Sequence, residues 1–276
     1  MTESIGRYEL KSYLGGGMAR VYRGYDPAIG REVAIKVLTE EGCLDPDQRA
    51  RLRMEGQILR QISHENVVKV FDFGEDERGR PFLVMELLQG EDLRHAIRNG
   101  HTGDLRGKVK IAIQIARAVE AVHQVGVIDR DLKPENVFLC ERGVVKLLDF
   151  GIAKVAGSVT TQAGYVLGTP SYMAPEQIQG DGITHLVDVW SFGAVLFELL
   201  TGAKAIPGKS IPEILYNTLF VPLDGEPMHR AGVPQSICDL VTRCLSKDPA
   251  GRPQGFGQIR AELERIIADA ADNKIG

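Results

Sequence analysis

The sequence predicts an α+β fold built of two lobes, the first rich in β-strands and the second mostly helical. Up to about residue 86, apolar residues come in short runs rich in β-branched and aromatic side chains, separated by Gly and Asp-Pro turns. Beyond residue 90 they recur with a period near 3.6 over longer stretches, which indicates half-buried helices. A chain of 276 residues, 43% of them hydrophobic, has ample material for a core.

The first lobe is expected to hold five strands and one main helix. The helix should begin at Asp45-Pro46-Asp47, because proline just inside the start and acidic residues in the first turn suit a helix N-terminus. It is expected to continue over residues 48–62. The expected strands are residues 8–14, 18–25, 32–38, 67–73 and 81–86.

The second lobe is expected to begin with a long, half-buried helix around residues 109–122. Residues 186–200 form the most apolar segment. They are too short to span a bilayer, which takes about 20 residues, so a buried core helix is expected there. The other expected elements are strands at 137–139 and 144–148 and helices at 184–200, 211–219, 235–245 and 256–268.

Composition excludes several classes of partner. The net charge of −4 offers no electrostatic footprint for nucleic acid or an anionic membrane. The first residues lack the basic region and apolar run of a signal peptide. The four cysteines are not closely paired, which favours reduced thiols in a cytoplasmic protein; they are Cys43, Cys140, Cys238 and Cys244. The sequence leaves open that the chain is the cytoplasmic domain of a longer, membrane-anchored protein.

One stretch, residues 129–136, together with a later aspartate, carries residue types suited to phosphoryl transfer. The carboxylate of Asp131 can accept or orient the proton of an attacking hydroxyl. Asn136 and Asp149 offer an amide oxygen and a carboxylate, which are hard ligands suited to Mg²⁺. Lys133 can neutralise charge on the transferred phosphoryl group. Any one of these is common in a surface loop, but the ordered set indicates a catalytic site.

Partner motifs surround this stretch. Upstream lie the glycine turn 14–22, the strand Val-Ala-Ile-Lys ending at Lys36, and Glu55 in the expected helix, which can pair with Lys36. Downstream lie Gly-Thr-Pro at 168–170 and Ala-Pro-Glu at 174–176. With these motifs the chain resembles the protein kinase superfamily, most closely the eukaryotic-like Ser/Thr protein kinases of bacteria. The resemblance runs from about residue 7 to 267. It implies a two-lobed kinase fold with the nucleotide in the cleft between the lobes.

The resemblance implies a catalytic domain at residues 7–270 and a C-terminal tail at 271–276. Within the domain it implies an N-lobe at 7–86, a hinge at 86–89 and a C-lobe at 90–270. Met85 would guard the back of the pocket, and main-chain groups of Glu86 and Leu88 would read adenine.

The resemblance further implies ATP and Mg²⁺ as cofactors and assigns residues to roles. The catalytic residues would be Asp131, Lys133, Lys36 and Glu55, and the metal ligands Asn136 and Asp149. The nucleotide would contact Leu14, Gly15, Gly16, Gly17, Val21, Ala34, Lys36, Met85, Glu86, Leu88, Asn136, Leu139 and Asp149. Three structural features of the family would be Glu176 paired with Arg252, Asp188 beneath the catalytic loop, and His123.

The segment before Ala-Pro-Glu resembles an activation segment, and two of its threonines are candidate phosphosites. Thr161 has the better register with the family's phosphorylated threonine, ahead of Thr160. A phosphate there would pair with Arg130 and order the segment. Thr169 is expected to bond to the catalytic loop. Protein substrates are implied, and a kinase-domain dimer for trans-autophosphorylation is left open.

Two departures from the family leave an alternative open. Asp129 replaces a histidine that packs against the phenylalanine of Asp-Phe-Gly, and we expect its carboxylate to accept backbone N–H bonds near residues 149–151 or to pair with a cation. The glycine loop is one residue short, with Ala19 in place of the last glycine. An active Ser/Thr kinase therefore competes with a pseudokinase that keeps the fold, with or without nucleotide, and signals by association. A small-molecule phosphotransferase is disfavoured by the activation segment.

Overall fold

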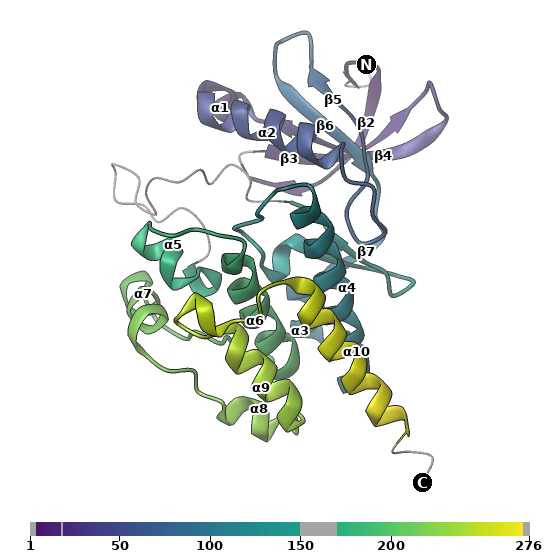
Figure 1. Ribbon diagram of the computed structural model, residues 1–276. Coiled ribbons are helices and arrows are strands. Elements are labelled where there is room, and N and C mark those ends of the chain that lie inside the picture. Colours follow the sequence, from purple (N-terminus) through teal and green to yellow (C-terminus); the bar gives the residue numbers. More distant parts are fainter. Residues whose placement is uncertain (1–3, 18, 150–169, 273–276) are drawn as a thin grey trace. The chain divides into compact units, whose positions relative to one another are not determined.

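The computed structural model describes residues 4–17, 19–149 and 170–272. The chain divides into two compact units, Met1–Gly90 and Glu91–Gly276 (Figure 1). The first unit is dominated by a sheet and the second by helices. This confirms the predicted α+β fold class.

The first unit is a six-stranded sheet with two helices. Its strand order is β1-β2-β3-β4-β6-β5, and each strand runs antiparallel to its neighbours. The strands are β1 (Ser4–Ile5), β2 (Tyr8–Gly16), β3 (Ala19–Asp26), β4 (Arg31–Leu38), β5 (Val70–Glu75) and β6 (Pro81–Glu86), and the helices are α1 (Glu40–Leu44) and α2 (Pro46–Leu59).

The two faces of this sheet have different roles. Val33, Ile35 and Val37 alternate along β4 and join a buried cluster with the start of β2 and with β6. Because successive side chains of a strand point to opposite faces, the intervening Ala34 and Lys36 lie on the other face. The apolar face thus provides the core of the unit and leaves the second face for function.

Helix α2 packs closely on β5 and β6 because it carries a glycine at the contact. A Cβ at Gly56 would lie 3.0 Å from Cβ and Cγ of Phe73 and 3.1 Å from Cδ1 of Leu83. The helix begins as the sequence predicts, with Asp45 as N-cap accepting from the N–H of Asp47 and with proline at the first helical position. The neighbouring Glu55 is thereby brought to the sheet.

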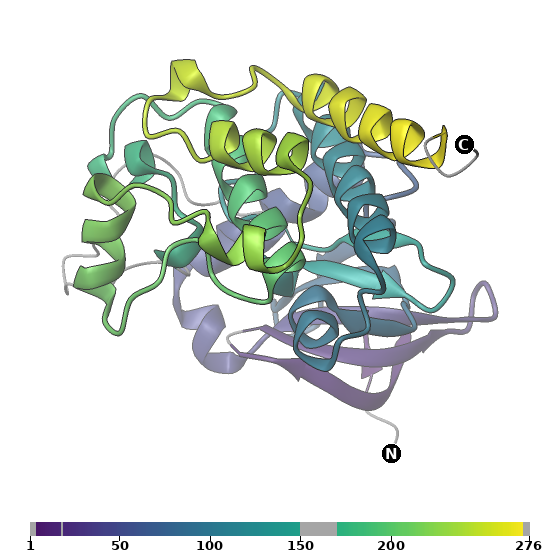
Figure 2. The same ribbon diagram turned by 90° about the horizontal axis from the view of Figure 1, so that it is seen from below.

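The second unit contains a three-stranded sheet, of order β7-β8-β9, among its helices. In both views α10 lies along α4 (Figures 1 and 2). The helices are α3 (Leu93–Asn99), α4 (Leu105–Gln124), α5 (Pro175–Gln179), α6 (Leu186–Thr201), α7 (Ile211–Phe220), α8 (Glu226–Arg230), α9 (Gln235–Cys244) and α10 (Phe256–Asp272). The strands are β7 (Gly90–Asp92), β8 (Val137–Cys140) and β9 (Val145–Leu147), and the 3₁₀ helices are η1 (Pro134–Asn136), η2 (Pro170–Tyr172) and η3 (Pro249–Gly251).

Helix α6 is the core of the second unit. Every residue from Leu186 to Leu200 is buried, including Asp188, Ser191 and Glu198. This confirms the buried core helix that the sequence predicts at this place. Among the described residues, no helix is long and apolar enough to cross a membrane.

The structure corrects some element boundaries. Strand β5 begins at Val70, three residues later than expected, because Val67 and Val68 are buried in a loop and their run reads like a strand. The sequence analysis did not predict β1, β7, α1, α3, α5 or α8. Strands of two or three residues and helices of five to seven are too short to show a period.

Lys247 generates a pH-dependent stability prediction. Its Nζ donates to the carbonyl oxygens of Asn217 (3.1 Å) and Thr218 (2.5 Å) in α7 and lies 4.9 Å from the ring centre of Trp190. Burial, with a smaller contribution from the Arg252 charge, lowers the pKa of Lys247 to about 8. In the unfolded chain the lysine pKa is about 10.4. Between these values the unfolded chain holds a proton that the folded protein has released, so stability rises with pH.

We therefore expect the free energy of unfolding of the wild type, relative to Lys247→Met, to rise by on the order of 1–2 kcal/mol from pH 7.5 to 10. Urea titrations at several pH values measure this difference. Lys209→Met, at an exposed lysine just before α7, is the control and should follow the wild-type curve. Parallel curves for wild type and Lys247→Met would contradict the assignment.

Candidate active site

In the first unit, Lys36 of β4 and Glu55 of α2 form an ion pair. Lys36 Nζ lies 2.9 Å from Glu55 Oε1 and 3.2 Å from Oε2. The two side chains are only 14% and 11% exposed. Such a pair is not a solvated surface contact, and both carboxylate oxygens fix the position of the ammonium group. The pairing predicted from the sequence is confirmed.

The sheet register gathers other predicted nucleotide residues on the face that carries Lys36. Val21 lies directly opposite Lys36 across β3 and β4, and Met85 lies opposite Ala34 across β4 and β6. Residues opposite one another in an antiparallel pair share a face. A small residue (Ala34), two apolar residues and a buried cation therefore line one side of the sheet, a surface suited to a flat apolar ring with phosphates at one end.

The glycine turn is a tight hairpin between β2 and β3. Gly16 pairs with Arg20, and Gly15 pairs with Val21. Gly16 has φ +125°, and a Cβ there would lie 2.1 Å from the carbonyl oxygen of Ala19. No side chain fits at this position, so the backbone remains open to close approach. Leu14 is 52% exposed beside it, and Gly17 follows.

The segment proposed as a hinge follows β6. The main-chain N–H of Glu86 donates to the carbonyl of Lys69 (2.9 Å), and its side chain accepts from the N–H of Lys69 (2.8 Å). The main-chain N–H of Glu86 therefore already has a partner within the first unit. Leu88 is half-buried two residues further on.

In the second unit, the loop before η1 is held by one carboxylate of α6. Asp188, which is fully buried, accepts the main-chain N–H groups of Asp129 (2.9 Å) and Arg130 (2.8 Å). His123 Nε2 lies 2.7 Å from the same carboxylate. The structural positions predicted for His123 and Asp188 are thus confirmed, and the start of the loop is fixed to the core helix.

Arg130 has a backbone conformation that side chains rarely adopt. Its φ is +64°, the only positive value at a non-glycine residue among the described residues. The N–H is bonded to Asp188, and the carbonyl accepts from Gln177 Nε2 at 3.1 Å. These bonds hold the turn that presents Asp131. The sequence analysis missed the role of Gln177; its place directly after Glu176 was the only available signal.

The proposed catalytic residues converge around Asn136. Lys133 Nζ lies 2.8 Å from Asp131 Oδ2. The amide nitrogen of Asn136 donates to the main-chain carbonyls of Asp131 (3.0 Å) and Asp149 (3.3 Å). Because these bonds use the nitrogen, the orientation of the Asn136 amide is fixed and its oxygen is the atom left for a cation. An amide oxygen beside the Asp149 residue fits the donor set of a divalent metal. Leu139, three residues beyond Asn136, is half-buried in β8.

Asp129 is fully buried, and its Oδ1 accepts the main-chain N–H of Asp131 at 3.3 Å. The carboxylate thus accepts a backbone N–H bond, here from the residue of the proposed base. Residues 150 and 151 lie outside the described residues, so the bonds expected near residues 149–151 stay a prediction. This contact supports the conformation of the loop at the position where the family has histidine.

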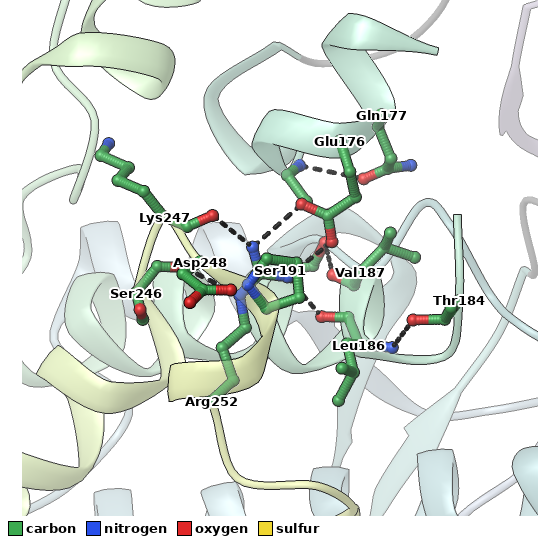
Figure 3. Close-up of polar contacts among 12 residues, drawn as sticks. Glu176, Gln177, Thr184, Leu186, Val187, Ser191, Ser246, Lys247, Asp248 and Arg252 are labelled. Carbon is green, nitrogen blue, oxygen red and sulfur yellow. Dashed lines mark hydrogen bonds and ion pairs between the residues drawn. The ribbon is translucent and has the colours of Figure 1, made fainter. Parts of the chain in front are cut away.

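Glu176 and Arg252 form the buried ion pair that the sequence predicts. Arg252 Nη1 and Nη2 lie 2.6 and 2.9 Å from the two carboxylate oxygens. The guanidinium also donates to the carbonyls of Ser246 (2.9 Å) and Leu186 (2.9 Å) (Figure 3). This network joins α5 to the start of α6 and to the segment before α10.

Several predicted positions lie outside the described residues. These are Met18 of the glycine turn, Phe150 and Gly151, the candidate phosphosites Thr160 and Thr161, and Gly168 and Thr169. The docking of a phosphate on Arg130 therefore stays a prediction.

A model of the protein kinase domain matches residues 8–262. The chain therefore belongs to the protein kinase family, as its motifs predict, and membership implies the use of ATP and a divalent metal in general.

Three of the relatives that the chain matches are named as serine/threonine-protein kinases of bacteria. A probable serine/threonine-protein kinase of Streptomyces coelicolor is 35% identical over 269 residues, which cover 95% of this chain and 40% of the relative. The serine/threonine-protein kinase pkn3 of Myxococcus xanthus is 34% identical, covering 94% and 50%. The serine/threonine-protein kinase PknB of Mycobacterium tuberculosis is 34% identical, covering 94% and 43%. The chain spans half or less of the length of these relatives.

The buried ion pair of Glu176 and Arg252 is expected to stabilise the fold. Arg252→Met leaves the carboxylate of Glu176 buried without its partner, so we expect a loss of about 3–5 kcal/mol in the free energy of unfolding. Chemical denaturation measures it. Arg230→Met is the matched control, since Arg230 and its partner Glu226 are 70% and 61% exposed, and should change stability by less than about 1 kcal/mol. A loss for Arg252→Met no larger than the control would show that the pair does not stabilise the fold.

Proposed function

We propose that the chain is an active Ser/Thr protein kinase, transferring the γ-phosphoryl group of ATP to hydroxyl groups of proteins, including its own. The observation that carries the proposal is the loop 129–136. Asp188 fixes its start, and Asn136 ties the carbonyls of Asp131 and Asp149 together. The names of the relatives support Ser/Thr specificity.

In the proposed mechanism, the hydroxyl oxygen of the substrate bonds to the γ-phosphorus, and the Asp131 carboxylate accepts the proton of that hydroxyl. The bond between the γ-phosphorus and the bridging oxygen breaks, and ADP leaves with the electron pair. Lys133, 2.8 Å from Asp131, places a positive charge beside the reacting groups. Positioning and electrostatic stabilisation account for most of the acceleration in such transfers.

We further propose Mg²⁺ as the divalent metal, held by the side chains of Asn136 and Asp149. When bound, it would neutralise charge on the nucleotide phosphates. Lys36, held by Glu55, would contact the α and β phosphates, and the face carrying Val21, Ala34 and Met85 would cover the adenine. A small residue at Ala34 leaves room for a flat ring.

Protein substrates and trans-autophosphorylation between two copies of the domain belong to the same proposal. The activation segment that ends in Ala-Pro-Glu supports protein substrates, and Ala174 and Pro175 are buried at the start of α5. The end of that segment, at α5, lies beside the catalytic loop, because Gln177 donates to the carbonyl of Arg130.

We predict Mg²⁺-dependent autophosphorylation on Ser and Thr, abolished to background by Asp131→Asn. General acid–base catalysis contributes about 10²- to 10⁴-fold, so a loss of that size is expected. Labelled ATP with phosphosite mapping measures it. Asp239→Asn, at an exposed aspartate of α9, is the control and should retain wild-type activity. A folded Asp131→Asn variant with nearly full turnover would show that the proposed base is wrong.

Nucleotide binding gives an independent prediction. MgATP should raise the melting temperature of the wild type, and Lys36→Met should reduce that shift and the transfer rate, because the variant lacks the charge aimed at the phosphates. Lys11→Met is the control, since Lys11 is exposed in β2, where its ammonium group contacts Glu9 and the ring of Tyr25. A wild type without any shift at millimolar nucleotide would favour the pseudokinase alternative.

A further inference from the structure

A cluster of five polar and charged side chains lies in the second unit, apart from the groups proposed to touch substrate. We call it the Arg94 cluster. It brings together α3, η1, η2, α6 and the segment after α6. Its members are Arg94, Glu135, Tyr172, Glu198 and Lys204.

Arg94 joins three partners with one guanidinium group. Its Nε lies 2.9 Å from Glu135 Oε1, Nη1 donates to Glu198 Oε1 at 3.2 Å, and Nη2 donates to the hydroxyl of Tyr172 at 2.5 Å. The contacts with Glu198 and Tyr172 are hydrogen bonds, whereas the contact with Glu135 is an ion pair without hydrogen-bond geometry. Arg94 therefore links Glu135 to α6 through an ion pair on one side and directed hydrogen bonds on the other.

Tyr172 completes the cluster from the other side. Its hydroxyl donates to Glu198 Oε2 (2.6 Å) and accepts from Lys204 Nζ (3.1 Å), while its carbonyl accepts from Ser191 of α6 (2.8 Å). Burial raises the pKa of the tyrosine, with the Glu198 charge acting in the same direction. Tyr172 is thus a neutral bridge within an otherwise charged set.

The charges of the Arg94 cluster balance, and one end of the cluster is more buried than the other. Two cations, Arg94 and Lys204, face two carboxylates, Glu135 and Glu198. The side chains of Arg94 and Glu198 are 18% and 7% exposed, whereas that of Glu135 is 41% exposed. The buried end therefore holds Arg94 firmly, and Arg94 in turn holds the more exposed Glu135.

The position of Glu135 connects the Arg94 cluster to the proposed catalytic loop. Glu135 lies in η1, between Lys133 and Asn136. The start of the catalytic loop is anchored by Asp188, and Asp131 lies between the two ends. Glu135 is the residue through which the far end of the loop is joined to α3 and α6.

We propose that Arg94 is a positioning residue, which acts through Glu135 to hold the far end of the catalytic loop, and so the spacing of Asp131, Lys133 and Asn136. The expected effect of Arg94 on catalysis rests on the proposed function. Its structural consequence, a rigid η1, is independent of catalysis. Arg94 also bonds to Tyr172, so the same side chain joins the end of the segment before α5 to the loop.

Hydrogen exchange tests the structural step without any need for activity. The N–H of Asn136 is bonded to Lys133 and that of Val137 to Pro134, so both report on η1. In Arg94→Met these amides should exchange about tenfold faster or more. Arg98→Met, at an exposed arginine of the same helix, is the matched control and should leave them unchanged. Equal exchange in both variants would overturn the proposal.

Kinetics test the catalytic step. In Arg94→Met we expect kcat to fall about tenfold, a barrier rise of about 1.4 kcal/mol, with KM for ATP changed less than about twofold. Arg94→Lys should restore part of the loss. In a cycle with Glu135→Gln, the double variant should be no slower than the slower single variant, because Arg94 acts through Glu135.

The outcomes separate the two levels of the proposal. Effects of Arg94→Met and Glu135→Gln that multiply in full would overturn the role of Glu135, even in a protein that transfers phosphate. A wild type with no transfer activity would overturn the proposed function, and hydrogen exchange would then decide on Arg94 alone. If Arg94→Met fails to fold because Glu198 is left uncompensated, Arg94→Lys and the double variant Arg94→Met/Glu198→Gln replace it in both measurements.

Discussion

The carboxylate of Asp188 is the contact on which the geometry of the second unit depends. It is fully buried in α6 and lies within hydrogen-bond distance of the N–H groups of Asp129 and Arg130 and of His123 Nε2. A buried carboxylate is costly unless its oxygens are satisfied, and each charge-assisted bond offsets about 1.5–3 kcal/mol. The cost therefore favours the loop conformation that supplies these donors. The left-handed conformation of Arg130 is held by the same contact.

The Asp188 carboxylate can hold the loop in one conformation only if the helix that carries it is rigid. Helix α6 is buried from Leu186 to Leu200, so it cannot move to relieve an unsatisfied group. The ion pair of Glu176 and Arg252 fixes the start of α6, since Arg252 also donates to the carbonyl of Leu186 (Figure 3). The packed apolar side chains keep α6 rigid, and the polar groups on α6 hold the loop at residues 129 and 130 in one conformation.

Much of this could be predicted from the sequence because the chemistry fixes residue types at fixed spacings. The pairs Lys36–Glu55 and Glu176–Arg252 follow from motif positions, and the structure confirms both. The role of Gln177 could not be predicted in the same way, since an amide that bonds to a distant main-chain carbonyl leaves no periodic signal. The bond from the N–H of Asp131 to Asp129 was likewise not predicted, because only the backbone path decides whether an aspartate bonds to the backbone two residues on. Short elements such as α5 and β7 lack the length that a period requires.

The alternation of apolar side chains along β4 explains why Lys36 lies on the face of the sheet opposite the core. Strand β4 alternates between Val33, Ile35 and Val37 in the core and Ala34 and Lys36 on the opposite face. A register slip of one residue would move the lysine into the apolar cluster and expose three valine or isoleucine side chains, at a cost of roughly 1.5–3 kcal/mol for each side chain moved. The hydrophobic pattern that stabilises the sheet therefore also fixes where the cation lies. One alternation thus sets both the core of the sheet and the face on which the proposed nucleotide residues lie.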